Sequence, residues 1–214
     1  LVPVLLFAVG LVLLIKGGAL GQLLEDVFGA NAGVVPVLMC AAVCLLASMN
    51  DMAAPSVSLE GRQLWLAQSL PVVPWQVLRA KLDVQLVLTG VPVLFCALCM
   101  VITLPGGALE KVLLVVVALL YTLLSALAAL ALGLKMPNLT WTNETTPIKQ
   151  SGCVMLALFA NWFYAIALGG LYFLCGKVLS AAAYLAIFAV VTAAGSALLL
   201  RWVKKQGARI FAAL

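Results

Sequence analysis

Long apolar runs occupy most of this chain and leave little choice of fold. A helix that crosses the hydrocarbon core of a bilayer needs roughly 20 apolar residues. With 66% hydrophobic residues, 9% charged residues and a mean hydropathy of +1.24, the composition is far outside the range of soluble domains. The chain is therefore expected to be an integral membrane protein. The predicted spans lie at about residues 1–15, 34–54, 82–104, 112–134, 152–175 and 178–202.

These runs predict helices, because the strands of an outer-membrane barrel alternate in polarity and do not stay apolar for more than twenty residues. Lipid offers no partners to backbone polar groups, so each run has to satisfy its own through helical hydrogen bonds. We expect an all-α fold, a polytopic bundle of about six transmembrane helices in a single domain, 1–214. The first run is short for a span, and because Leu1 is not an initiator methionine, we expect the chain to be a piece of a longer product.

The basic residues predict the orientation of the bundle. Three of them, Lys16, Lys111 and Lys177, fall on one side, and nine fall on the other. By the positive-inside rule, the side with nine is cytoplasmic. This places the loops at 55–81 and 135–151 and the tail at 203–214 in the cytoplasm of a multi-pass plasma-membrane protein. The nine residues are Arg62, Arg79, Lys81, Lys135, Lys149, Arg201, Lys204, Lys205 and Arg209.

The positive net charge of +5 is thus a topology signal. No basic cluster with interleaved aromatic residues lies in a soluble segment, so we expect no nucleic-acid partner. In the tail, Trp202 suits the headgroup region. We expect Val203, Ile210, Phe211 and Leu214 to lie on the inner leaflet while the basic residues between them face lipid phosphates.

The sequence contains no recognisable catalytic or metal-binding pattern. It has no histidine and six cysteines that all fall within or beside the apolar runs, including the pair Cys96 and Cys99, so we interpret them as small core residues. No predicted span carries an acidic or basic residue near its centre, which argues against a proton-coupled pump. Asn161 is the most polar residue inside a span; it either lines a path or makes an interhelical hydrogen bond. We expect no enzyme activity and no bound cofactor or metal in this chain.

A polar segment punctuated by proline, residues 56–81, separates the second and third predicted spans. Ser58 is a good helix N-cap, and Pro71 ends a helix, so we expect a short cytoplasmic helix from Leu59 to Ser69. Its apolar residues point in more than one direction, with Leu59, Leu66 and Leu70 on one stripe and Leu64 and Trp65 elsewhere. Such a helix either rests on the membrane alone or offers its second apolar side to a protein partner. Pro74 then suits the first turn of the next helix.

The segment SVSLEGRQLWLAQSLPVVPWQVLRAK resembles the first intracellular loop of type-two ABC exporter permeases. The loop PNLTWTNETTPIKQS at 137–151 and the end RWVKKQGARIFAAL are similar to those of a group of large bacterial ABC exporter permeases. The resemblance covers most of the chain from about residue 45. Those permeases often have about twice as many spans, so this chain resembles the carboxyl-terminal half of one, located in the bacterial inner membrane.

The resemblance implies a permease subunit that couples ATP hydrolysis by a separate ABC ATPase subunit to export. Residues 56–81 would form a cytoplasmic coupling loop, ATP and Mg would bind in the ATPase, and two permease halves would pair as a dimer surrounded by membrane lipid. The residues implied for the coupling helix are Glu60, Gly61, Arg62, Trp65, Leu66, Leu70 and Pro71. Those implied for a second cytoplasmic loop are Pro137, Asn138, Trp141, Asn143, Glu144, Pro147 and Lys149.

Two other functional classes fit the composition. A secondary transporter or channel-like facilitator is disfavoured by the absence of charges within the spans, although an uncharged facilitator passes that test. An intramembrane enzyme acting on lipid or peptide is disfavoured by the lack of histidine and of any acid–base or metal-binding set. An ATPase encoded beside this chain would favour the exporter over both.

Overall fold

The computed structural model describes residues 2–28, 34–69, 71–104, 107–141, 143, 145–149, 151–176 and 179–214. All regular structure in these residues is helical, which confirms the predicted fold class. Five helices are long and apolar enough to cross a membrane, and a sixth, α2 (Val34–Ser48), is apolar but shorter. The five are α1 (Val2–Phe28), α4 (Pro74–Thr103), α5 (Ala108–Lys135), α7 (Gly152–Cys175) and α8 (Ala181–Trp202).

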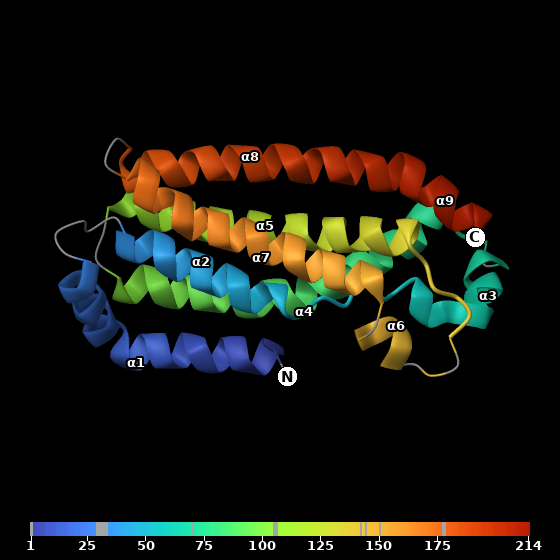
Figure 1. Ribbon diagram of the computed structural model, residues 1–214, viewed down its shortest axis with the longest axis horizontal. Helices are drawn as coiled ribbons and strands as arrows, with labels where there is room; N and C mark the ends of the chain where they lie inside the picture. Colours follow the sequence, from blue (N-terminus) through green and yellow to red (C-terminus); the bar gives the residue numbers. More distant parts are fainter. Residues whose placement is uncertain are drawn as a thin grey trace.

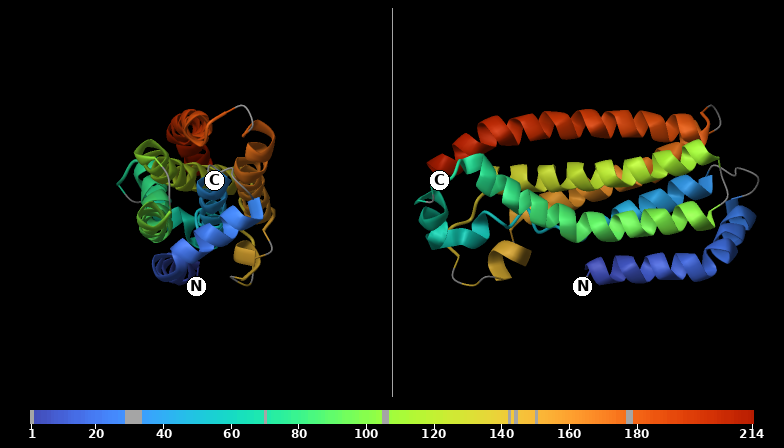
Figure 2. Two further views of the ribbon diagram at one scale, coloured as in Figure 1. Left: turned by 90° about the vertical axis from the view of Figure 1, so that its left-hand side faces the viewer. Right: turned by 180° about the vertical axis from the view of Figure 1, so that it is seen from behind.

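The long helices run side by side along the molecule, with the short elements gathered at one end (Figure 1). Helix α5 packs against α2, α4, α7 and α8, whereas α1 contacts mainly α4 at the edge of the bundle (Figure 2). Close packing holds this edge helix: the Cys96 thiol donates to the Leu6 carbonyl over 2.8 Å. A Cβ on Gly10 would come within 2.7 Å of the Phe95 ring. Here a small residue lets two helices approach closely.

Several observed helices differ in length from the predicted spans. Helix α1 continues to Phe28, far beyond the predicted end near residue 15, and α2 ends at Ser48 instead of near 54. The segment after α2 leaves the helix because its backbone finds partners on α4: the Met52 amide donates to Gln85 Oε1 over 2.7 Å. Helix α4 begins at Pro74, as the proline predicted.

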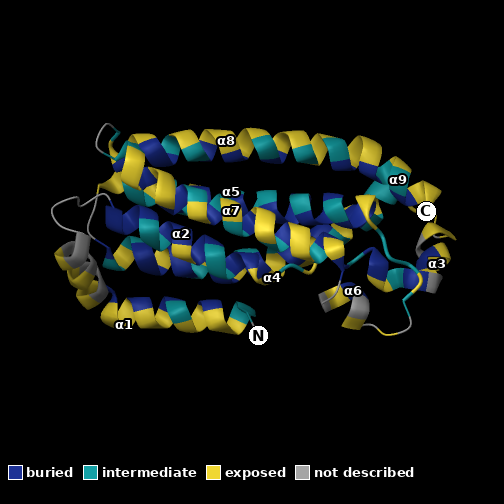
Figure 3. Ribbon diagram, viewed as in Figure 1, coloured by how far each residue is buried: buried dark blue, intermediate teal, exposed yellow. Residues whose placement is uncertain are grey.

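Much of the outer surface of the long helices is exposed (Figure 3), and many of the exposed side chains are large and apolar; we call this surface the apolar belt. Val4, Ile102, Phe163 and Val190, from four different helices, are each at least 70% exposed. Monomeric soluble proteins rarely expose contiguous apolar surface on this scale. The burial pattern therefore agrees with the composition: this is a multi-pass membrane protein whose outer face meets lipid.

The carboxyl-terminal tail continues the last long helix. A turn of π-helix, η2 (Val203–Gly207), leads into α9 (Ala208–Ala213). Val203 and Phe211 are 0% and 1% exposed and pack into the core between α4 and α5. The prediction that these two side chains lie on the inner leaflet is wrong, because the end of the bundle offers them a protein surface to cover.

Candidate functional site

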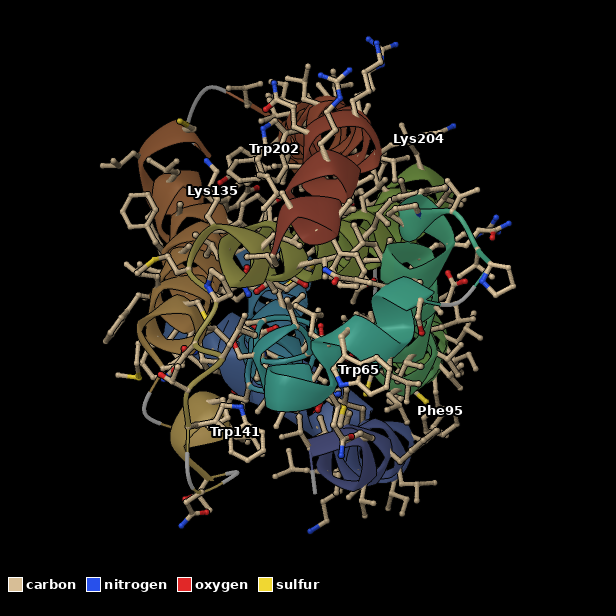
Figure 4. All side chains as sticks on the ribbon, turned by 90° about the vertical axis from the view of Figure 1, so that its right-hand side faces the viewer. Trp65, Phe95, Lys135, Trp141, Trp202 and Lys204 are labelled. Atoms are coloured by element: carbon tan, nitrogen blue, oxygen red, sulfur yellow. The ribbon has the colours of Figure 1, made fainter. Side chains whose placement is uncertain are left out.

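Three segments that are distant in sequence meet at one end of the bundle. They are the connection from α2 to α4, the connection from α5 to α7, and the tail η2–α9 (Figure 1). The first contains η1 (Ser58–Gln63) and α3 (Leu64–Ser69), and the second contains α6 (Thr145–Lys149). We call residues 58–69 the connector segment. Figure 4 looks onto this end of the molecule, with Trp65 and Trp141 labelled.

The connector segment is not the single α-helix that the sequence predicts from Leu59 to Ser69. It begins as a 3₁₀ turn and becomes α-helical only at Leu64, with a kink at Gly61, whose φ is +47° and ψ −123°. No other residue in the described part of the chain has a positive φ. This backbone conformation is open to glycine and strained for other residues. The helix ends at Ser69, two residues before Pro71, as predicted.

Ser58 joins the connector segment to the second loop. Its hydroxyl accepts a hydrogen bond from the Asn138 amide over 3.0 Å, and its carbonyl accepts one from Trp141 Nε1 over 2.6 Å. Ser58 therefore does not cap the helix that follows, contrary to the sequence prediction; Val57 occupies that position without a side-chain cap. The Trp141 indole also packs over Gly61, where an added Cβ would lie 3.1 Å from Nε1. The two predicted loops thus form one unit.

An ion pair joins the connector segment to the first turns of α4. Lys81 Nζ lies 2.7 Å from Glu60 Oε1 and also donates to the Ser56 carbonyl over 2.9 Å. The two side chains are only 14% and 24% exposed, so water screens this pair less than a surface pair. Removing either partner would leave the other shielded charge uncompensated.

A third attachment reaches the tail. Gln68 Nε2 donates to the Phe211 carbonyl over 2.8 Å, across 143 residues of sequence. Nothing in the sequence signals this contact, because Gln68 is one polar residue among several and Phe211 contributes only its backbone. The connector segment is therefore attached to α4, to the second loop and to α9.

One face of the connector segment remains uncovered. Leu64 points into the core at 4% exposure, as does Val57 just before the segment at 0%, whereas Trp65 and Leu66 are 66% and 53% exposed. Both exposed side chains lie at the end of the molecule that carries most of the charge, beyond the apolar belt. The segment thus has one apolar side on the bundle and one side free, but the grouping differs from the predicted one, which separated Leu66 from Trp65.

The second loop contributes further predicted residues. Pro137 follows α5, Asn138 Oδ1 accepts from the Thr140 amide, and Asn143 Oδ1 accepts from the Thr145 amide at the start of α6. Pro147 is buried within α6, which contacts η1. Leu70 and Glu144 lie outside the described residues, as do the side chains of Arg62 and Lys149.

Asn161 lies far from this end, in the middle of α7. It is 7% exposed, and its carbonyl accepts a hydrogen bond from Tyr121 Oη of α5 over 3.3 Å. This bond uses the backbone carbonyl of Asn161 and not its side-chain amide, so the interhelical and path-lining roles of that side chain both stay predictions.

A polar cluster that sequence reasoning missed lies where α2 ends. Asn50 Nδ2 donates to Thr89 Oγ1 over 2.9 Å, and Gln85 Nε2 donates to the Asn50 carbonyl and, over 3.2 Å, to Thr89 Oγ1. Gln85 and Thr89 face inward from α4 at 4% and 3% exposure. Their spacing of four residues on a helix is the signal that could have identified them.

Asp51 lies beside this cluster, beyond the last residue of α2 and outside the long helices. Both carboxylate oxygens are buried, and neither has a hydrogen-bond partner among the described residues. Burial raises the pKa of Asp51 to about 7, and the nearby backbone amide of Ala54 offsets this only in part. Asp51 lines an open groove of about 340 Å³ beside the connector segment. Met52, Leu59, Lys81 and Ile148 are among its other lining residues.

Comparisons of the chain with models of protein families, with curated proteins and with solved structures find no match. The helices, their exposed apolar surface and the polar end together make the chain a polytopic helical membrane protein.

Proposed function

We propose that this chain is the membrane-spanning permease subunit of an ATP-binding-cassette exporter, in which the connector segment docks onto a separate ATPase subunit. The observation that carries the proposal is the exposed pair Trp65 and Leu66 on a segment bonded to three other parts of the bundle. A few side chains near the centre of a contact surface, tryptophan prominent among them, supply most of the binding energy of protein interfaces. ATP and Mg bind in the partner, and this chain supplies no catalytic group.

The three attachments supply a route for force. A displacement of the connector segment acts on α4 through the Glu60–Lys81 ion pair. It acts on the α5–α7 connection through Ser58 and Trp141, and on the tail of α8 through Gln68. Because the pairs are short and partly buried, they move together as a unit, and the helices they join tilt with them. ATP-driven closure of the partner thereby changes which side of the bundle is open.

The distribution of charge supports a cytoplasmic location for this unit. Glu60, Lys81, Lys135 and the basic residues of the tail lie at the same end as the connector segment. The positive-inside rule assigns that end to the cytoplasm, where ATP is available. Two such subunits, or one longer chain with twice the spans, enclose the transport path.

Replacing Trp65 and Leu66 together with Asp tests the proposal. Both side chains are exposed, so the bundle should still fold, and the recovery of the ATPase with the tagged chain from native membranes should fall about tenfold or more. The matched control is Met136→Asp, which places a charge on another exposed apolar residue at the same end but outside the connector segment. Equal recovery of an ATPase with the double variant and with the wild type would refute the docking role, as would the absence of any ATPase from the wild-type preparation.

A further inference from the structure

A groove of about 310 Å³ lies between the last turns of α5 and the end of α8, away from the connector segment. Its walls are Ala128, Ala131, Leu132, Lys135, Leu199 and Trp202. All but Lys135 are apolar, and the two alanines leave the space that larger side chains would fill. From Ala128 to Lys135 the helix rises about 10 Å. The groove therefore runs from the charged end of the bundle into its apolar belt.

A cation and an aromatic ring mark the outer end of the groove. Lys135 Nζ lies 5.1 Å from the centre of the Trp202 ring, and Figure 4 shows the two side chains side by side. Lys135 is exposed, and no ion pair with a carboxylate involves it in the described part of the chain. The ring holds the ammonium group over the groove without neutralising its charge.

Charge complementarity identifies the occupant. The exposed residues Arg201 and Lys205 lie on either side of Trp202 in the sequence and add to the basic character of this end. Basic pockets between transmembrane helices bind the headgroups of anionic lipids, and tryptophan is enriched at headgroup depth. An apolar groove with a single cation at its mouth matches one acyl chain joined to one phosphate.

We propose that this groove is a binding site for an anionic glycerophospholipid, with the phosphate at Lys135 Nζ and one acyl chain against Ala128, Ala131 and Leu199. The bound lipid covers the line of contact between α5 and α8. The carboxyl ends of these two helices lead to different polar segments, the second loop and the tail. The site does not depend on the transport role, because it uses none of the residues of the connector segment.

Native mass spectrometry of the purified chain with equal amounts of phosphatidylglycerol and phosphatidylcholine tests the site. The wild type should retain phosphatidylglycerol in preference to phosphatidylcholine. Lys135→Gln should lower the affinity of the chain for phosphatidylglycerol about fivefold, which is the contribution of one lysine near an anionic lipid surface. The matched control is Lys204→Gln, which removes the same charge from a side chain that points away from the groove (Figure 4). It should leave the affinity unchanged.

A second variant tests the part of the groove that would hold the acyl chain. Ala128→Leu fills the groove and leaves Lys135 in place, so it should reduce retention of phosphatidylglycerol while the variant keeps the wild-type unfolding temperature. If Ala128→Leu does not fold, quenching of tryptophan fluorescence by phosphatidylglycerol with brominated chains replaces it, and Trp202→Phe should remove part of that quenching. Equal losses for Lys135→Gln and Lys204→Gln, equal retention of the two lipids, or quenching unaffected by Trp202→Phe would each overturn the proposal.

Discussion

At the scale of single residues, Asp51 links the stability of the fold to pH. Its oxygens are buried without a partner among the described residues, and its pKa rises from 3.8 to about 7. A buried carboxyl group favours the neutral form, because the charged form loses its hydration. The folded protein therefore keeps a proton on Asp51 that the unfolded chain releases.

Folding consequently takes up a proton between about pH 4 and pH 7. The free energy of unfolding therefore falls as the pH rises through that window, on the order of 4 kcal/mol in all. Asp51→Asn should remove this dependence and should raise the thermal unfolding midpoint above neutral pH, measured in detergent across that range. Asp83→Asn is the matched control, since the Asp83 side chain is 56% exposed. A wild-type midpoint that rises between these pH values would contradict the assignment.

At the scale of elements, Gly61 determines the shape of the connector segment. Its positive φ kinks the chain within the 3₁₀ element η1, three residues before α3 begins; Glu60 on one side of the kink reaches Lys81, and Trp65 and Leu66 on the other side face outward. The Trp141 indole lies against the same glycine. The kink and the joining of the two loops are thus one structural feature.

Gly61→Ala should strain the backbone by about 1–3 kcal/mol and displace Trp141 from Ser58. We expect faster hydrogen exchange across residues 58–69 and a change in tryptophan emission. Gly90→Ala is the control, because Gly90 lies inside α4 with no atom within 4 Å of an added Cβ; it should leave exchange unchanged or slow it, as alanine favours helix. Unaltered protection of residues 58–69 in Gly61→Ala would show that the kink does not hold the loops together.

At the scale of the whole molecule, charge and apolar surface are divided between regions. The exposed apolar residues of the apolar belt are spread along the long helices, and the connector segment, second loop and tail lie at one end of these helices (Figure 1). Leu66 lies at this end, and Leu109, 65% exposed, begins α5 at the opposite end.

Single cysteines at these two positions test the orientation that the positive-inside rule predicts. In a background without the six native cysteines, a membrane-impermeant maleimide should label Leu109→Cys in intact cells and Leu66→Cys only after permeabilisation. The opposite result would place the connector segment outside the cell, away from ATP, and would exclude the proposed docking.

The sequence predicted some features of the site and missed others. Trp65 and Leu66 were expected to be available to a partner, and both are exposed. The role of Ser58 was misjudged, because a serine before a helix suggests a cap, whereas here its hydroxyl meets the backbone of Asn138, 80 residues away. The polar cluster around Gln85 and the burial of Phe211 were missed because each depends on which segments meet.

The sequence by itself determined that the chain forms membrane-spanning helices with its charges concentrated at one end. Both properties are local: lipid forces each apolar run to satisfy its own backbone, and the location of a charge follows from the run it flanks. Only the tertiary structure decided that the connector segment is kinked and bonded to three other elements. These contacts join residues such as Ser58 and Trp141, 83 positions apart, and their partners are defined by the packing of the bundle.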